Sequence, residues 1–382
     1  MCPHALAYPS KGFGANHNEF FLAQRRGLFI LKLVQYTHSG HGSSGRAPAL
    51  GAGGSRFKSG CPDKVFMSSK FLPTVFNVRH ASSDWTETTA ASGKCLLSRP
   101  CQTPFLFSSL VLSARLRLPP ESAALLEVQF QTSHGWSDFY KLGLFLPDSL
   151  HSFPACQDAQ GRVEIDEVCP AEASSVYRFR LTLSGLAQAD FVAAALVSAD
   201  FHYTPEQAAC LPHGSYAHPA EPISQMEQKT EDRRRICSPT SLCMALRALG
   251  KDVSLDEVLA AVYDKTAGIY GNWMANTAAA NRLGALSYFR RFESLAELAD
   301  FLSPDSLVVA SVGYGPGELT NAPLERTAGH LVLVRGWGDG QVLTADPAAE
   351  TRASVLRAYH AQEFAKVWLH NKKGAAYVVR RK

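Results

Sequence analysis

The sequence predicts an α+β protein in which an all-β region precedes a region of helices and then strands. Three observations support this fold class. Residues 70–205 alternate apolar and polar side chains with period two, between turns rich in Pro, Gly, Asp and Ser. After residue 222 the apolar residues recur at helical spacing, and short apolar strands follow them. Helices followed by a run of strands are typical of an antiparallel α+β sheet.

The all-β region is predicted from several strands with no strong helix between them. In 174–185, for example, Phe179, Leu181 and Leu183 share one face of the strand. The other clear period-two segments are 111–119, 125–133 and 139–147. Strands of this kind over 70–205 predict a jelly-roll-like β-sandwich. The proline-rich segment that follows, 206–222, is predicted to be a linker to a second domain over 223–382.

The first 66 residues differ in composition from the rest of the chain. They hold eight of the 38 Lys and Arg residues but only two acidic ones, and 39–60 is rich in Gly and Ser. Such a composition buries too little apolar surface to offset chain entropy, so we expect a disordered basic extension over 1–66. Met67 is an alternative position for the physiological start of the chain. The remainder is slightly acidic, which argues against a nucleic-acid partner.

The apolar runs and the cysteines bear on location. No run approaches the roughly 18 apolar residues that cross a bilayer, and Lys32 interrupts the nearest candidate, 25–36. That segment also lacks a convincing cleavage site for a signal peptide. The nine cysteines are odd in number and scattered, which is typical of a reducing compartment. We therefore expect a cytoplasmic protein without a membrane span, and secretion by a non-standard route stays open.

The second region contains well-marked helix starts. Ser254 with Glu257 and Ser294 with Glu297 have the form of capping boxes, and each opens an apolar-periodic run. A third helix is expected to begin after Asn272 and to end before 284. The segments 306–313, 330–337, 341–346 and 375–379 are predicted to be strands.

Cys237 lies at the predicted start of a helix in the segment "RRRICSPTSLCMALRALG". Pro239 suits the first helical turn, and Gly250 suits the position just past the last turn. The unpaired N–H groups and the positive end of the helix dipole favour a thiolate there, so Cys237 suits a nucleophile. The alternative is an inert, buried thiol. Cys243 projects about 240° further around the helix and is assigned to the core.

A thiolate nucleophile needs a proton acceptor and a group that orients the acceptor. His330 follows a glycine at the start of a predicted strand, and Asp346 ends the next strand. Because antiparallel pairing brings the start of one strand beside the end of the next, we expect His330 and Asp346 to be neighbours. Asp339 is a competitor, but its Gly neighbours indicate a hairpin turn that faces solvent.

Several ordered blocks resemble the C39-like family of papain-like cysteine peptidases. They are 237–246, 268–284, 317–337 and 346–348, within about 222–382. The resemblance implies Cys237 as nucleophile, His330 as general base and Asp346 as the residue that orients it. It also implies an oxyanion-hole glutamine upstream of the cysteine, with Gln225 the first candidate and Gln228 the second.

The resemblance implies a cysteine peptidase that hydrolyses amide bonds of a peptide or protein substrate through a thioester, with no cofactor and no metal. An amidase, a deamidase or a cell-wall hydrolase with the same triad stays open, as does a binding protein whose papain-like domain has lost turnover. The chain has no G-x-x-x-x-G-K-[ST] loop, so we expect a standalone member rather than part of a peptide exporter.

Two further features have alternative interpretations. In the all-β region Trp85, Trp136 and Tyr140 could form a platform for a carbohydrate ligand, although core packing is favoured for them. A protein ligand of this region also stays open. The arginines at 233–235 either steer an acidic substrate or belong to a solvated turn, and the turn is favoured.

Overall fold

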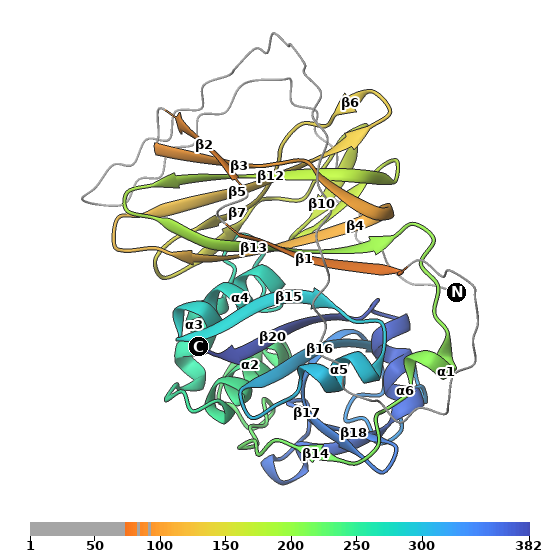
Figure 1. Ribbon diagram of the computed structural model, residues 1–382. Helices are drawn as coiled ribbons and strands as arrows, with labels where there is room; N and C mark the ends of the chain where they lie inside the picture. Colours follow the sequence, from red (N-terminus) through yellow and green to blue (C-terminus); the bar gives the residue numbers. More distant parts are fainter. Residues whose placement is uncertain (1–72, 82–84, 91–92) are drawn as a thin grey trace, which may run out of the picture. The chain divides into compact units, whose positions relative to one another are not determined.

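The computed structural model describes residues 73–81, 85–90 and 93–382. A β-rich part extends from β1 to β13, and a mixed part of helices and strands follows it (Figure 1). Both fall within one compact unit. The predicted basic extension, 1–66, lies outside the described residues. None of the helices in the described ranges combines the length and the apolar character needed to cross a membrane.

The β-rich part is built entirely from antiparallel pairs. Its strands are β1 (Val75–Ala81), β2 (Trp85–Ala90), β3 (Gly93–Ser98), β4 (Cys101–Arg117), β5 (Ala123–Thr132), β6 (Gly135–Trp136), β7 (Tyr140–Phe145), β8 (Leu150–Ser152), β9 (Cys156–Gln157), β10 (Gly161–Glu164), β11 (Glu167–Pro170), β12 (Ser174–Ser184) and β13 (Gln188–Ser198). The pairs connect them in the orders β2-β3-β12-β5-β7-β8 and β1-β13-β4-β11-β10-β9, and β6 pairs with β5.

The long strand β4 connects these two series of paired strands. It pairs with β12 at its start, where Cys101 lies opposite Tyr177, and with β13 over most of its length. The two series share a core in which Phe107, Leu126 and Phe179 are completely buried. On β12 the buried side chains alternate with half-buried arginines, as the period-two pattern predicts. The arrangement is consistent with the predicted sandwich.

The mixed part contains a second antiparallel sheet and the longer helices. Its elements are α1 (Pro205–Ala208), β14 (Tyr216–Ala217), η2 (Glu231–Arg234), α2 (Cys237–Ala248), α3 (Leu255–Val262), α4 (Trp273–Arg282), β15 (Ala285–Arg291), α5 (Leu295–Phe301), β16 (Ser306–Tyr314), β17 (Thr327–Gly338), β18 (Gln341–Ala345), η3 (Arg352–Ser354), β19 (Leu356–His360), α6 (Ala361–Ala365), η4 (Lys366–His370, a π-helix) and β20 (Ala375–Arg381). The sheet order is β15-β20-β16-β17-β18-β19, and β14 pairs with β17. Part of the predicted linker, 206–222, is therefore built into this sheet.

The helix starts follow the predicted caps, with one exception. Ser254 and Glu257 form both bonds of a capping box, and the Asn272 side chain caps α4. Ser294 accepts from the Glu297 N–H group, but the Glu297 carboxylate accepts from the backbone N–H of residue 293 instead of returning to Ser294. The second predicted box is thus only half formed, because the same carboxylate is also shared with a neighbouring arginine.

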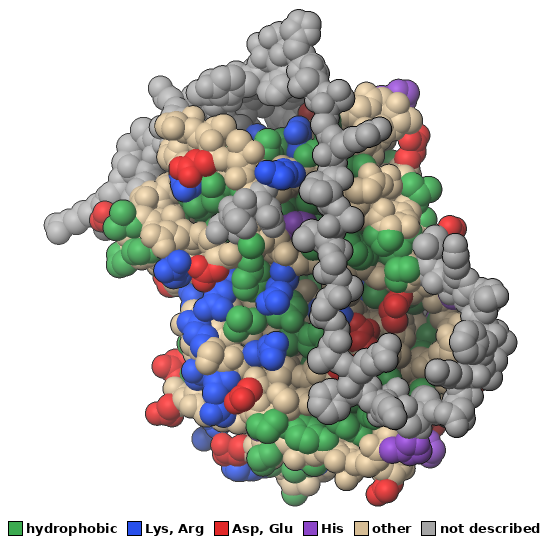
Figure 2. All heavy atoms as spheres, in the orientation of Figure 1, with side chains coloured by type: hydrophobic (Ala, Val, Ile, Leu, Met, Phe, Trp, Pro, Cys, Tyr) green, Lys and Arg blue, Asp and Glu red, His purple; other side chains and the backbone are tan. Residues whose placement is uncertain are grey.

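Charge is unevenly distributed over the mixed part. Figure 2 shows Lys and Arg side chains gathered on one face around the end of the chain, where Arg380, Arg381 and Lys382 are exposed. Arg381 pairs with Asp305 at 3.0 Å between Nε and Oδ1. Exposed pairs of this kind contribute little to stability.

Candidate active site

The helix α2 begins at Cys237, as predicted. Pro239 lies in its first turn, and Gly250 follows its end with a φ of 79°. Cys237 is half-buried, whereas Cys243 is completely buried in the core. Burial raises the pKa of Cys243 to about 11, so this second thiol stays protonated at neutral pH. The two cysteines of the helix therefore lie in different surroundings.

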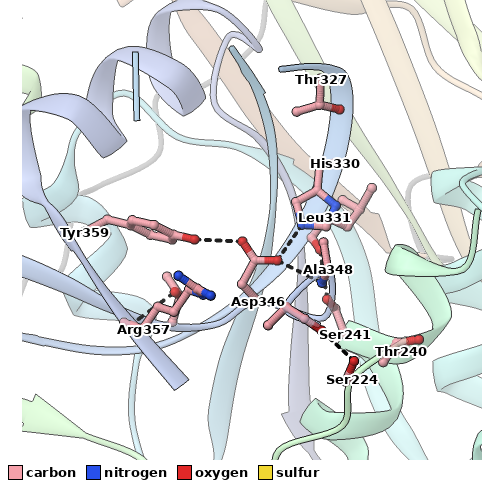
Figure 3. Close-up of polar contacts among 12 residues, drawn as sticks. Ser224, Thr240, Ser241, Thr327, His330, Leu331, Asp346, Ala348, Arg357 and Tyr359 are labelled. Atoms are coloured by element: carbon pink, nitrogen blue, oxygen red, sulfur yellow. Dashed lines mark hydrogen bonds and ion pairs between the residues drawn. The ribbon is translucent and has the colours of Figure 1, made fainter. Parts of the chain in front are cut away.

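His330 and Asp346 are joined by a buried hydrogen bond. His330 lies in β17, which begins at Thr327 and not at the histidine itself, and Asp346 directly follows β18. His330 Nε2 lies 2.7 Å from Asp346 Oδ1, and both side chains are almost fully buried (Figure 3). Because Nε2 faces the carboxylate, Nδ1 is the ring nitrogen left to interact with Cys237, whose pKa His330 lowers.

The pKa shifts of Cys237 and His330 have opposite directions. Burial alone would raise the pKa of Cys237, but the hydrogen bond with His330, its charge and the Leu331 N–H group lower that pKa overall. Burial alone would lower the pKa of His330, yet the charge of Asp346 and the hydrogen bonds to Asp346 and Cys237 raise it to about 10. The site thus favours a thiolate beside an imidazolium.

Two further donors hold Asp346 in its charged form. Tyr359 Oη donates to Asp346 Oδ2 over 2.7 Å, and the Ala348 N–H group donates to Oδ1 over 3.0 Å (Figure 3). Burial would raise the pKa of Asp346, but the charge and hydrogen bond of His330, together with these two donors, lower it overall. Tyr359 lies on β19, opposite Val342 of β18. Sequence reasoning missed it because neither β19 nor a partner for Asp346 carries a recognisable pattern.

The two candidate glutamines differ in what their side chains contact. The Gln225 N–H group donates to Pro347 O over 2.9 Å, which places this residue beside the segment that carries Asp346. The Gln225 side chain is buried, and its Oε1 has no hydrogen-bond partner in the described part of the chain. Gln228 Nε2 donates to Ser224 O over 2.7 Å, so its amide already holds the local backbone. Gln225 is therefore the better candidate.

The remaining predicted residues are placed outside this cluster. Asp339 is exposed in the β17–β18 turn with a φ of 51°, as expected for a turn residue facing solvent. Arg235 pairs with Asp232 at 2.9 Å between Nη1 and Oδ1. The exposed Arg233 and Arg234 line a surface hollow of about 560 Å³ together with residues 228–231. Within the described ranges, no group of three or more His, Cys, Asp or Glu side chains could hold a metal ion.

The three aromatic side chains considered for a carbohydrate ligand do not form an open platform. Tyr140 is buried and stacked on Phe130, with ring centroids 5.6 Å apart, so its face is not available to a ligand. Trp85 packs edge-on against Phe179 in the core. Trp136 is covered by an arginine side chain. Core packing, the interpretation favoured from the sequence, accounts for Tyr140 and Trp85, whereas Trp136 packs against Arg178.

One family model matches most of the mixed part. Residues 219–376 match the model of the Peptidase_C39 like family, which confirms the resemblance and supports a peptidase. No curated protein matches the chain. A solved double glycine motif protease from an AMS/PCAT transporter, in complex with the leader peptide, is 18% identical over 44% of this chain and 95% of its own, with a TM-score of 0.32. A proposed C39-like peptidase from Bacillus anthracis is 17% identical over 44% and 98%, with a TM-score of 0.33.

A third structure is less similar. The Clostridium thermocellum endo-1,4-beta-D-xylanase 10B, with its CBM22-1 and GH10 modules complexed with xylohexaose, is 10% identical over 36% of this chain and 28% of its own, with a TM-score of 0.17. All three TM-scores are too low to carry an argument about function.

Proposed function

We propose that this chain, whose residues 219–376 match the Peptidase_C39 like family, is a cysteine peptidase that hydrolyses peptide bonds with a papain-like triad. The triad consists of Cys237 as nucleophile, His330 as general base and acid, and Asp346 as the residue that orients the imidazole. One observation carries the proposal: His330 Nε2 lies 2.7 Å from the buried carboxylate of Asp346, and the imidazole lowers the pKa of the thiol at the start of α2.

The reaction begins with the thiolate of Cys237 attacking the carbonyl carbon of the scissile bond. A carbon–sulfur bond forms, and the carbonyl π electrons move onto oxygen. The His330 imidazolium then donates its proton to the leaving amine as the carbon–nitrogen bond breaks, which leaves a thioester on Cys237. His330, now neutral, takes a proton from a water molecule that attacks the thioester. The carboxylic acid departs, and the proton and the thiolate return to their starting positions.

The oxyanion formed in both steps needs hydrogen-bond donors. We assign the Gln225 side-chain amide and the Cys237 backbone N–H group to this role. The first residue of an α-helix has no intrahelical partner for its N–H group, so this donor is available. Removing one oxyanion-hole donor costs about 3 to 4 kcal/mol in comparable sites. Gln225 is favoured over Gln228 because the second amide is already bound to Ser224.

The domain assignment belongs to the same proposal. We assign a β-sandwich domain to 70–205 and the peptidase domain to 223–382, joined by the segment 206–222, whose strand β14 pairs with β17. An amidase, a deamidase or a cell-wall hydrolase would use the same three side chains, because they differ from a peptidase only in the amide that is cleaved. A binding protein without turnover would keep the fold but would not require an activated thiol.

A peptide-library digest separates these possibilities. The library is incubated with the wild type, with Cys237→Ala and with Cys243→Ala, and the products are identified by mass spectrometry. We expect backbone cleavage by the wild type and by Cys243→Ala, whose missing thiol lies in the core, and none by Cys237→Ala. Cleavage that survives in Cys237→Ala would overturn the proposal. Release of ammonia from side-chain amides without backbone cleavage would identify a deamidase instead.

A further inference from the structure

A continuous set of buried hydrogen bonds connects the β-rich part to the residue next to Cys237. It passes through the N-terminal end of α4. We infer that the β-rich part positions the start of α2, with Asp166, Asn276 and Ser238 as the positioning residues. The catalytic meaning of this inference rests on the proposed function of Cys237, but the mechanical connection does not.

The first link is made by Asp166, which lies in the turn between β10 and β11. Its side chain is almost fully buried, and its Oδ2 accepts from the N–H groups of Trp273 at 2.6 Å and Met274 at 3.4 Å. These are the first two residues of α4. Helix N-termini carry unpaired N–H groups and a partial positive charge. The side chain of Asp166, from the β-rich part, therefore caps a helix of the mixed part.

The second link fixes the N-cap residue of the same helix. Asn272 Nδ2 donates to Asp264 Oδ2 over 2.8 Å, while the Ser152 N–H group at the end of β8 donates to Asp264 Oδ1 over 3.3 Å. The Asn272 Oδ1 atom accepts from the Ala275 N–H group over 2.9 Å. Asp264 is completely buried, so its bonds are not exchanged for water. The β-rich part thus contacts the α4 cap at two separate points.

The third link runs from α4 to α2. Ser238 Oγ donates to Asn276 Oδ1 over 2.9 Å, and both side chains are completely buried. Asn276 Nδ2 donates to the carbonyl oxygens of Tyr270 and Asn272, each at 2.8 Å, and this fixes which end of the amide faces Ser238. Ser238 directly follows Cys237 in the first turn of α2. A shift of α4 therefore displaces the nucleophile.

Apolar side chains of α4 pack into the hydrophobic cores of both the β-rich part and the mixed part. The core of the β-rich part includes Met274, Ala275 and Ala278. The core of the mixed part includes Ala279 and Ala280 of the same helix. A methyl group placed on Gly143 of β7 would come within 2.8 Å of Met274 Cε, which shows how closely the two surfaces fit. In Figure 1, α4 lies between the β-rich part and α2. The helix cannot move relative to the β-rich part without breaking both kinds of contact.

The test compares Asp166→Ala and Ser238→Ala with Asn77→Ala as a matched control. Asn77 makes two 2.9 Å hydrogen bonds to the Arg291 backbone across the same interface, and Arg291 belongs to β15 rather than to α4. Amide hydrogen exchange of the peptide covering 236–241 reports on the first turn of α2. The pH midpoint of Cys237 alkylation reports on the thiolate. Asp166→Asn serves as a milder variant, because its amide oxygen still accepts from the helix.

We expect exchange over 236–241 to be about tenfold faster in Asp166→Ala and in Ser238→Ala, the size of one lost hydrogen bond of about 1.4 kcal/mol. The alkylation midpoint should rise in both variants. Asn77→Ala and Asp166→Asn should leave both readouts near the wild type. The double variant with Asp166→Ala and Ser238→Ala should show little more change in exchange than either variant alone, because both substitutions interrupt the same set of hydrogen bonds.

Unchanged exchange over 236–241 in Asp166→Ala, or an equal rise in Asn77→Ala, would overturn the inference. If Asp166→Ala does not fold, Ser238→Ala decides by the same two readouts. A wild-type thiol with an ordinary midpoint would remove the proposed catalytic function, while faster exchange in Asp166→Ala would still support the mechanical connection. The two failures are therefore distinguishable.

Discussion

Tyr359→Phe removes one hydrogen bond from the buried carboxylate that orients His330. In the structure, Tyr359 Oη lies 2.7 Å from Asp346 Oδ2, and both side chains are at most 1% exposed. A hydrogen bond to a charged group contributes about 1.5 to 3 kcal/mol, and water cannot easily replace the missing donor at a buried site. We therefore expect the free energy of unfolding to fall by about 2 kcal/mol.

The same substitution should also slow the reaction. The Tyr359 hydroxyl helps to keep the pKa of Asp346 low, so its loss makes the ionised form of this carboxylate less favourable and leaves the group that orients His330 less firmly held. We expect kcat to fall about tenfold, the equivalent of 1.4 kcal/mol, with little change in KM, because Tyr359 is fully buried and does not face the substrate.

Urea unfolding and steady-state kinetics measure these two effects, and Tyr314→Phe is the matched control. The Tyr314 hydroxyl is also buried, and it has no hydrogen-bond partner in the described part of the chain. Its removal should therefore leave stability and kcat within about 0.5 kcal/mol of the wild type. If Tyr359→Phe behaved like Tyr314→Phe in both assays, the assigned role of Tyr359 would be wrong.

Three further predictions follow from single contacts. Burial raises the pKa of Asp166 from 3.8 to about 7, so its contribution to stability is complete below pH 3.8 and is lost as the pH rises through about 7. In urea titrations from pH 4 to pH 8, Asp166→Asn should gain up to about 4 kcal/mol relative to the wild type, and a constant difference would contradict this. Gln225→Ala should lower kcat by about 10² to 10³-fold, whereas Gln228→Ala should not, and equal losses would refute the oxyanion assignment. Ser254→Ala should lower the free energy of unfolding by about 1 kcal/mol in a urea melt, because the Glu257 N–H group loses the Ser254 hydroxyl that caps it, while the bond from the residue 254 N–H group to the Glu257 carboxylate remains.

Much of this fold follows from local patterns in the sequence. The start of α2 at Cys237 and its end before Gly250 agree with the positions of Pro239 and the glycine, because both residues act within one turn of the helix. The proximity of His330 and Asp346 follows from antiparallel pairing of consecutive strands, which needs no long-range information. Helix caps and the pairing of consecutive strands depend on residues that are close in the sequence, so they can be predicted from one sequence.

The contacts that hold the site together were not predicted. Tyr359 reaches Asp346 from a strand, β19, that shows no clear alternation of apolar residues. Asp166 reaches α4 from a turn of the β-rich part, more than 100 residues earlier in the chain. The second capping box was predicted but is half formed, because Glu297 has stronger partners nearby. Each of these depends on which distant segments meet, and a single sequence does not contain that information in any local pattern.

The central claim is that His330 activates the Cys237 thiol. The most direct measurement is the pH dependence of iodoacetamide labelling at Cys237, read by mass spectrometry of the peptide that contains it, in the wild type and in His330→Ala. Because the hydrogen bond and the charge of His330 lower the pKa of Cys237 against the effect of burial, the wild type should label with a midpoint below the ordinary thiol value of about 8.5. In His330→Ala the midpoint should rise to that value or above it. A wild-type thiol that labels only near about pH 8.5, and that does not respond to His330→Ala, would contradict the account.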